Sequence, residues 1–308
     1  MSSKSAYSDV EKKVSACYST WANNYYDQYY GDAASYPPVQ ANLILELLES
    51  AGVTTLLDAG CGPASFLRHM AKSKIEWHGF DLTPEMVEEA RRVAKKLRRE
   101  NSKIWVGSVL EDQAFSPPDG SRISFDGAVM IGVLPHIPPE DDVEVLRRLA
   151  KSVKKGGLLV AEARNALFGL FTLNRPSFNL FNDRLIDWEL LKNSASIDDK
   201  LKVDVLKEAL SNFFRMDRPL VRVGKKDEPG YDEVLSRSHI PFELAECARQ
   251  AGWDNVEIKY CHFHILPPMF EYLIPKSYQT ASLKLEDPND WRGMIMASVF
   301  MVTGKKQC

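Results

Sequence analysis

Two patterns of apolar residues, one typical of strands and one typical of helices, alternate along the first half of this chain. Short apolar runs, typical of buried strands, cover residues 53–57, 75–80, 104–107, 125–132 and 158–161. Between them, apolar residues at i, i+3 and i+4 predict helices that begin at Phe66, run from Thr83 to about Arg98, and cover 141–153. Strands that alternate with helices in this way predict an α/β fold, with a parallel sheet and helices on both of its faces.

An aromatic stripe precedes the first predicted strand. Tyr18, Trp21, Tyr25 and Tyr29 recur at helical spacing, and the pattern ends at Gly31. Such a stripe is typical of a helix packed on the core. It would also suit a cover over a bound ligand, because a tyrosine ring buries apolar area while its hydroxyl can still donate a hydrogen bond.

The alternation of strands and helices ends after the fifth predicted strand. Residues 165–240 mix phenylalanines with charged residues and prolines, which predicts an inserted, mainly helical lid. The phenylalanines either form a small core of the lid or reach a substrate, where they would exclude water. A helix over 242–251 and strands over 256–264 and 295–302 follow, and the two strands are expected to form an antiparallel edge pair.

The predicted organisation therefore has three parts. Residues 1–164 hold the aromatic cover helices and a cofactor-binding core, and residues 165–240 form the substrate lid. Residues 241–308 complete the core with one helix and the last two strands.

Composition narrows the possible partners. The 39 basic and 42 acidic residues give a net charge of −3, and no basic tract suits a nucleic acid. The five cysteines are scattered without C-x-x-C spacing, which argues against a disulfide framework or a zinc site. With no long apolar run and a polar amino terminus, we expect a cytoplasmic protein without a membrane partner. The oligomeric state is not predicted.

A glycine turn follows the first predicted strand, in the stretch Leu56–Ser65. The strand ends in Asp58, two glycines follow at Gly60 and Gly62, and a helix begins directly afterwards. Glycine permits a positive φ and leaves no Cβ between the chain and a ligand, so this turn indicates a nucleotide-like cofactor at the carboxyl end of a strand. Asp81 ends the second strand about 20 residues later, where a carboxylate can accept hydrogen bonds from a ribose diol.

These motifs together resemble the class I S-adenosylmethionine-dependent methyltransferases. The resemblance rests on Asp58-Ala59-Gly60-Cys61-Gly62 followed by Ala64, on Asp81 with Thr83 and Met86, and on shorter matches at 107–110, 125–126, 132–136 and 155–157. It implies a Rossmann-like sheet of seven mostly parallel strands with an antiparallel last strand. It also implies S-adenosylmethionine as cofactor and S-adenosylhomocysteine as product. No metal is expected. Ala64 stands where the family often has glycine, and is expected to have a negative φ.

The resemblance assigns cofactor contacts residue by residue. Asp58 and the two glycines would hold the methionine end of the cofactor, and Asp81 would bind its ribose. Leu82 and Met86 would flank the adenine, and Ile131 and Gly132 would form the wall beside the sulfonium. Cys61 fills the tight turn and is not expected to act as a nucleophile. The full set of expected cofactor contacts is Tyr18, Asp58, Gly60, Cys61, Gly62, Asp81, Leu82, Met86, Ser108, Val109, Leu110, Ile131 and Gly132.

Three histidines are candidate catalytic bases. His136 follows the fourth strand, although it could instead be a helix-entry residue bonded to backbone. His262 and His264 are expected to share one face of the strand over 260–265, where they could bind substrate, form an acid/base pair or take a metal. Two histidines without a third ligand are only a weak metal signal.

The residues after the fifth strand are candidates for binding the substrate. They are Arg164, Asn165 and Phe168. Arg164 would suit an anionic group, or it could pair with Glu162.

The sequence thus predicts a methyltransferase that acts on a small-molecule or glycan-like acceptor. Oxygen is favoured over nitrogen as the acceptor atom, because candidate bases are present. An N-methyltransferase and a non-catalytic cofactor-binding partner protein are the alternatives. An NAD-dependent oxidoreductase is a more remote one, because Ser65 stands where the dinucleotide fingerprint has glycine or alanine.

Overall fold

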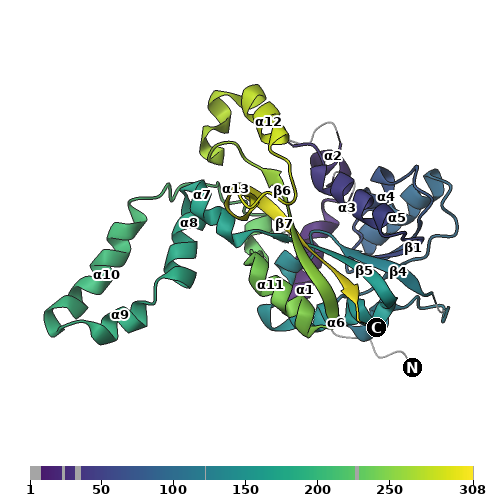
Figure 1. Cartoon of the computed structure of the whole chain (residues 1–308), viewed down its shortest axis with the longest axis horizontal. Helices are drawn as coiled ribbons and strands as arrows, with labels where there is room; N and C mark the ends of the chain where they lie inside the picture. The colour runs from purple at the N-terminus through teal and green to yellow at the C-terminus, as the bar shows by residue number, and fades with distance from the viewer. Residues whose placement is uncertain (1–7, 23–24, 32–35, 122, 226–228, 308) are drawn as a thin grey trace. The chain divides into compact units, whose positions relative to one another are not determined.

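The structure is a computed structural model that describes residues 8–22, 25–31, 36–121, 123–225 and 229–307 (Figure 1). The chain divides into two compact units. Unit 1 comprises residues 1–164, 222–259 and 299–308, and unit 2 comprises residues 165–221 and 260–298.

Unit 1 is organised around a seven-stranded sheet with the strand order β3-β2-β1-β4-β5-β7-β6 (Figure 1). Strands β1 to β5 pair in parallel, and β7 pairs antiparallel with β5. The strands are β1 (Thr55–Ala59), β2 (Glu76–Asp81), β3 (Ile104–Val106), β4 (Phe125–Met130), β5 (Val153–Arg164), β6 (Trp253–Phe263) and β7 (Ala297–Lys306). The predicted fold class is confirmed.

Helices cover both faces of this sheet. From β1 the chain moves outward through α4 and α5 to β2 and β3, and from β4 it moves in the opposite direction through α6 to β5. Because such crossovers are right-handed, α6 lies on the opposite face from α4 and α5. The helices of unit 1 are α1 (Asp9–Ser19), α2 (Tyr25–Tyr29), α3 (Val39–Ser50), α4 (Ser65–His69), α5 (Pro84–Lys96), α6 (Asp142–Ser152) and α11 (Pro241–Gln250), with short turns η1 (Asp112–Phe115), η2 (Leu134–His136), η3 (Pro139–Asp141) and η6 (Tyr231–Glu233).

The strand order reverses between β1 and β4, and this reversal positions the site. Each of the two strands continues into a loop that turns away from its neighbour, so a crevice forms at their carboxyl ends. The apolar run that predicts β4 is buried on both sides, as expected for an inner strand.

Several elements differ from their sequence predictions. The aromatic stripe forms two helices, because α1 ends at Ser19 and α2 begins at Tyr25. Strand β1 runs through to Ala59, two residues beyond its apolar run, since Asp58 is buried and hydrogen-bonded. Strand β5 is much longer than its apolar run because it pairs with β4 on one side and with β7 on the other.

Unit 2 is mainly helical. It contains η4 (Ala166–Phe168), α7 (Gly169–Thr172), α8 (Arg175–Leu180), η5 (Phe181–Leu185), α9 (Trp188–Ser194), α10 (Ile197–Ser211), η7 (Pro268–Leu273), α12 (Pro275–Lys284) and α13 (Gly293–Met296). The predicted lid covered 165–240 alone, whereas unit 2 joins 165–221 to the segment 260–298. The three-part division of the chain stays a prediction.

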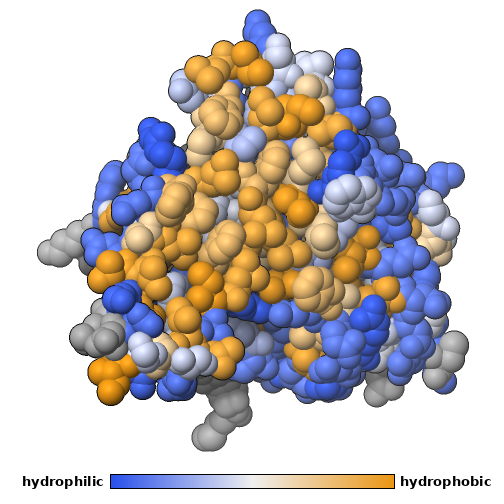
Figure 2. All heavy atoms as spheres, turned by 60° about the vertical axis from the view of Figure 1, so that its left-hand side comes forward, coloured by the Kyte–Doolittle hydropathy of each residue, from blue (hydrophilic) through white to orange (hydrophobic). Residues whose placement is uncertain are grey.

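Aromatic residues of the insert pack on one another. Phe178 and Phe181 both contact the ring of Phe214, which gives this part a small core of its own. Other apolar side chains of unit 2 are exposed, including Ile197 and Phe213. Figure 2 shows a face of the molecule on which apolar residues gather. Among the helices that the structure describes, none has the length and apolar character needed to cross a membrane.

Candidate functional site

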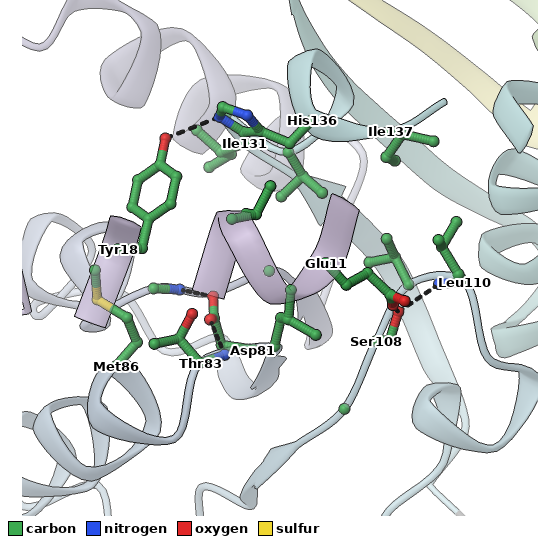
Figure 3. Close-up of a pocket in the computed structure, with 18 of the residues that line it drawn as sticks. Glu11, Tyr18, Asp81, Thr83, Met86, Ser108, Leu110, Ile131, His136 and Ile137 are labelled. Atoms are coloured by element: carbon green, nitrogen blue, oxygen red, sulfur yellow. Dashed lines mark hydrogen bonds between the residues drawn. The ribbon is translucent and has the colours of Figure 1, made fainter. Parts of the chain in front are cut away.

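A pocket opens at the carboxyl edge of the sheet in unit 1 (Figure 3). It contains about 780 Å³ of empty space, part of it open to solvent. Its walls come from α1, the loops after β1, β2, β3 and β4, and the start of α5. The lining residues are Glu11, Val14, Tyr18, Tyr25, Gly60, Gly62, Pro63, Asp81, Leu82, Thr83, Met86, Gly107, Ser108, Val109, Leu110, Ile131, Gly132, Val133, His136 and Ile137.

The glycine turn forms the floor of this pocket, and its two glycines have different tasks. Both adopt positive φ, +81° at Gly60 and +51° at Gly62. A Cβ on Gly60 would overlap Cγ2 of Val133, whereas a Cβ on Gly62 would meet nothing within 4 Å. Gly60 is therefore required for packing, and Gly62 leaves open space where a ligand can approach the backbone.

The residue after the turn corrects one expectation. Ala64 has a φ of +60° and is the N-cap of α4, so the expected negative φ is wrong. The chain must pass through a left-handed residue to change from the turn into the helix. For alanine this conformation costs about 1–2 kcal/mol, which explains why glycine is common at this position in the family.

Asp81 joins three elements at the edge of the pocket. Its carboxylate accepts hydrogen bonds from the backbone N–H of Gly62 at 2.9 Å and of Thr83 at 2.8 Å (Figure 3). Burial raises the pKa of Asp81, and these two bonds oppose that rise. A carboxylate has about four lone-pair positions, so Asp81 can still accept bonds from a ligand diol.

Asp58 and Cys61 do not line the pocket, although both were predicted to contact the cofactor. The Asp58 carboxylate accepts a hydrogen bond from Trp77 Nε1 at 3.1 Å, and burial raises its pKa to about 7. The Cys61 side chain packs against Gly79, and burial raises its thiol pKa. These two residues support the turn from within the core, and Cys61 lacks the thiolate character of a nucleophile.

Helix α1 lies along the pocket (Figure 3). Its first turn is a capping box between Ser8 and Glu11, and the Glu11 carboxylate also accepts a hydrogen bond from the Ser108 hydroxyl. Ser108 Oγ in turn accepts the N–H of Leu110 at 3.0 Å. Glu11 was missed in the sequence, where only the Ser8-x-x-Glu11 capping pattern marks it.

Tyr18 and His136 meet at the other end of α1. The Tyr18 hydroxyl is 2.8 Å from His136 Nε2 (Figure 3). On the other side of the ring, His136 Nδ1 is 2.6 Å from the Leu235 carbonyl oxygen. Since a carbonyl only accepts, Nδ1 carries the proton, and Nε2 accepts the tyrosine O–H. Burial lowers the pKa of His136 to about 4, so the ring is neutral near pH 7.

Glu162 and Arg164 lie at the end of β5, beside this region. Arg164 donates to Ser236 Oγ at 2.6 Å, and its guanidinium stacks 4.9 Å from the Tyr231 ring centre. Within the described residues no ion pair joins Arg164 to Glu162. The Glu162 carboxylate instead accepts the backbone N–H of Gly132, and burial raises its pKa to about 7.

The remaining predicted site residues belong to unit 2. His262 has a φ of +61° and β6 ends at Phe263, so the expectation that His262 and His264 share a strand face is wrong. His264 Nδ1 is 2.9 Å from the Tyr278 hydroxyl, and its ring lies 4.8 Å from that of Phe168. A role for His262, His264 and Phe168 in the reaction stays a prediction.

Asn165 has a structural role. Its side-chain amide donates to the backbone carbonyls of Met294 and Ala297, and its oxygen accepts the N–H of Leu167. These bonds tie the start of the insert to the segment before β7. Because its polar atoms are already engaged, we no longer expect Asn165 to contact the substrate.

The site has the features that a nucleoside cofactor with a methionine tail requires. An open glycine turn, a carboxylate with free lone pairs and the apolar side chains of Leu82, Met86 and Val109 surround one cavity. Among the described residues, no group of three or more His, Cys, Asp or Glu side chains is arranged to hold a metal ion. The fold and site define an α/β domain of the cofactor-binding, methyltransferase type.

Comparison with known proteins identifies the family. Residues 57–159 match the Methyltransferase domain family. The chain is 30% identical over 120 residues to the ubiquinone biosynthesis O-methyltransferase of Vibrio parahaemolyticus, covering 39% of this chain and 48% of that protein. It is 31% identical over 139 residues to the enzyme of the same name from Xanthomonas euvesicatoria, covering 44% and 53%. The matched stretch thus spans about half the length of these relatives.

A solved structure with a related arrangement is human N-acetylserotonin methyltransferase in complex with SAM. It is 11% identical, covers 94% of this chain and 56% of that chain, and has a TM-score of 0.48, so it adds nothing to the assignment. The predicted family, class I S-adenosylmethionine-dependent methyltransferase, is confirmed by the matched domain and by the strand order.

Proposed function

We propose that this chain transfers a methyl group from S-adenosylmethionine to an oxygen of a small-molecule acceptor. The pocket of unit 1 is the observation that carries the proposal. It brings together twelve residues expected to serve the cofactor or the reaction: Tyr18, Gly60, Gly62, Asp81, Leu82, Met86, Ser108, Val109, Leu110, Ile131, Gly132 and His136.

The cofactor would lie across the carboxyl ends of β1, β2 and β4. Gly60 and Gly62 would hold its methionine end, Asp81 its ribose hydroxyls, and Leu82 and Met86 its adenine. When bound, S-adenosylmethionine supplies a methyl group activated by a sulfonium. The protein then has to align the acceptor and exclude water, and in the best intramolecular models alignment contributes about 7–11 kcal/mol.

Helix α1 supports the exclusion of water. It reaches the pocket at three successive turns through Glu11, Val14 and Tyr18, and it is fastened at each end by hydrogen bonds to the loops after β3 and β4. The sharper of the two interpretations of the aromatic stripe is thereby supported at Tyr18 and Tyr25, which both line the pocket.

An oxygen acceptor is supported by the matched relatives, which are named O-methyltransferases. A nitrogen acceptor would need the same cavity and is the alternative outcome of an acceptor screen. Arg164 is stacked and hydrogen-bonded beside the site, so we propose that it attracts an acceptor with a negative group. A glycan-like acceptor stays among the compounds to be screened.

Calorimetry with S-adenosylhomocysteine and with NAD tests the cofactor, and mass spectrometry of products from a panel of phenols, sugars and amines tests the activity. We expect binding of S-adenosylhomocysteine alone, and a product heavier by one methyl group. Asp81→Ala should weaken the binding at least about tenfold, since it removes a charged acceptor. Binding of NAD alone, or unchanged affinity in Asp81→Ala, would refute the assignment. Cofactor binding without any methylated product would favour the non-catalytic partner protein.

A further inference from the structure

We propose that Glu162 is the group that takes the proton of the hydroxyl being methylated. The inference rests on the proposed function and adds to it the identity of the base, for which the sequence offered only histidines. It is carried by the place of Glu162 at the carboxyl end of β5, beside the wall of the pocket, and by its unpaired oxygen.

The position of Glu162 follows from the pairing of β4 and β5. Met130 is paired with Ala161, so Ile131, the first residue after β4, lies beside Glu162, which is still part of β5 and pairs with Met301 of β7. Ile131 and Gly132 line the pocket, and the N–H of Gly132 donates to the Glu162 carboxylate. The carboxylate is therefore one hydrogen bond away from the pocket wall.

One oxygen of this carboxylate has no partner. Glu162 Oε2 exposes less than 1 Å² to solvent and makes no hydrogen bond with the residues that the structure describes. An unpaired buried carboxylate oxygen costs free energy, and such costs are retained where a function uses them. Glu162 does not itself line the pocket, so a proton from an acceptor there would reach this oxygen through Tyr25, which does.

The groups around Glu162 come from α2, from the residue just after it and from β5. The negative charge of Glu162 helps to raise the pKa of Tyr25 on α2 and of Tyr30 just after it. Arg164 lies two residues further along β5 and lowers the pKa of Glu162. The Tyr25 hydroxyl lies 3.8 Å from the place where a Cβ on Gly132 would be. Tyr25 and Glu162 thus both approach Gly132, and Tyr25 also lines the pocket, so its hydroxyl is the group between the acceptor and the carboxylate.

The state of ionisation supports this role. Burial raises the pKa of Glu162 to about 7, against the lowering effects of Arg164 and of the Gly132 N–H. A base is most effective when its pKa is close to the working pH. His136, by contrast, has a pKa lowered to about 4, and its only free nitrogen lone pair already accepts the Tyr18 hydroxyl.

The step balances in atoms and charge. The acceptor oxygen forms a bond to the methyl carbon while the carbon–sulfur bond breaks, and its electron pair stays on sulfur, which becomes a neutral thioether. The acceptor's hydroxyl proton passes to the Tyr25 hydroxyl, which gives its own proton to the Glu162 carboxylate, and the carboxylate becomes a neutral carboxylic acid. The site therefore loses one positive and one negative charge together, and the carboxyl later returns the proton to water.

The test compares the full chain with Glu162→Gln, which keeps the shape and an acceptor for the Gly132 N–H but cannot take a proton. With saturating S-adenosylmethionine and an acceptor found in the screen, we expect kcat to fall about 10²- to 10⁴-fold and its rise with pH near 7 to disappear. The affinity for S-adenosylhomocysteine should change less than about threefold. Asp58→Asn is the matched control, because Asp58 is also buried with a pKa near 7. That variant should keep the rise of kcat near pH 7.

A second readout does not need an acceptor. Infrared difference spectra of the protein without ligand should show two buried carboxyl groups that titrate near pH 7 in the wild type, since Asp58 and Glu162 both have a pKa of about 7. The band that is lost in Glu162→Gln should remain in Asp58→Asn. The inference would be overturned if Glu162→Gln kept both kcat and its pH profile, or if the Glu162 band titrated at an ordinary carboxyl pH. Failure of the wild type to bind S-adenosylhomocysteine would instead refute the proposed function, so the two failures are distinguishable.

Discussion

Replacing each of the two turn glycines by alanine separates stability from cofactor binding. In Gly60→Ala the new Cβ overlaps the Val133 side chain, and the residue must also keep a φ of +81°. The left-handed conformation costs about 1–2 kcal/mol, and overpacking adds about 1–3 kcal/mol. We therefore expect Gly60→Ala to lower the free energy of unfolding by about 2–5 kcal/mol.

Gly62→Ala is the matched variant, since Gly62 lies two residues along in the same turn with a φ of +51° and has no atom within 4 Å of a new Cβ. Only the conformational cost of about 1–2 kcal/mol applies to it. Its Cβ would project into the open space where the cofactor is proposed to approach the backbone. We expect this variant to lose S-adenosylhomocysteine affinity at least about tenfold.

Thermal unfolding and calorimetry on both variants provide the assay. A loss of 1 kcal/mol lowers the Tm of a domain of this size by about 2–4 °C, so Gly60→Ala should unfold several degrees below Gly62→Ala. Equal Tm values would contradict the packing role of Gly60. A Gly62→Ala protein that binds S-adenosylhomocysteine as tightly as the wild type would show that the cofactor does not approach this backbone.

Three further predictions concern the supports of the site. Asp58 has a pKa of about 7 in the folded protein and about 4 in the unfolded chain, so between these pH values the folded state binds one proton more. The free energy of unfolding therefore falls as the pH rises from about 4 to 7, by at most about 4 kcal/mol. Urea unfolding should accordingly show Asp58→Asn gaining stability relative to the wild type between about pH 4 and 7, and a constant difference would contradict this. Tyr18→Phe should cost about 1–3 kcal/mol by the same method, because it leaves His136 Nε2 without its donor, and an unchanged free energy of unfolding would disprove the bond. Ser8→Ala should speed amide exchange at Glu11 but not in β1, since the capping box holds only the first turn of α1, and equal protection at Glu11 would refute that role.

The glycine turn and Asp81 could be predicted from the sequence because their signals are local. Backbone conformation at Gly60 and Gly62 is set by the turn itself, and the end of a buried strand marks where Asp81 lies. The same reasoning was wrong at Ala64, where a left-handed residue was required but no glycine marked it. A sequence reveals a position with positive φ only when glycine, the usual residue for that conformation, occupies it.

The contributions of Glu11 and Glu162 could not be predicted, because each depends on contacts between distant parts of the chain. Glu11 reaches Ser108 from a helix that precedes the sheet, and the surroundings of Glu162 are set by the pairing of β5 with β4 and by α2. The histidines show the opposite error. An alternating strand pattern placed His262 and His264 on one face, but the positive φ of His262 breaks the alternation that the argument needed.

Within unit 1, the chain just before the first inserted segment is hydrogen-bonded to the chain that follows it, near the pocket residue His136. The chain leaves unit 1 at Arg164, and after the insert the backbone N–H of His239 donates to the Arg164 carbonyl oxygen at 2.8 Å. The same returning segment supplies the Leu235 carbonyl that sets the tautomer of His136 and the Ser236 hydroxyl that holds the Arg164 guanidinium. The groups that hold Arg164 and His136 in place thus belong to the part of unit 1 that follows the insert. A change in this returning segment alters the residues that would face the acceptor. This gives a physical reason why the glycine turn does not determine which acceptor is used.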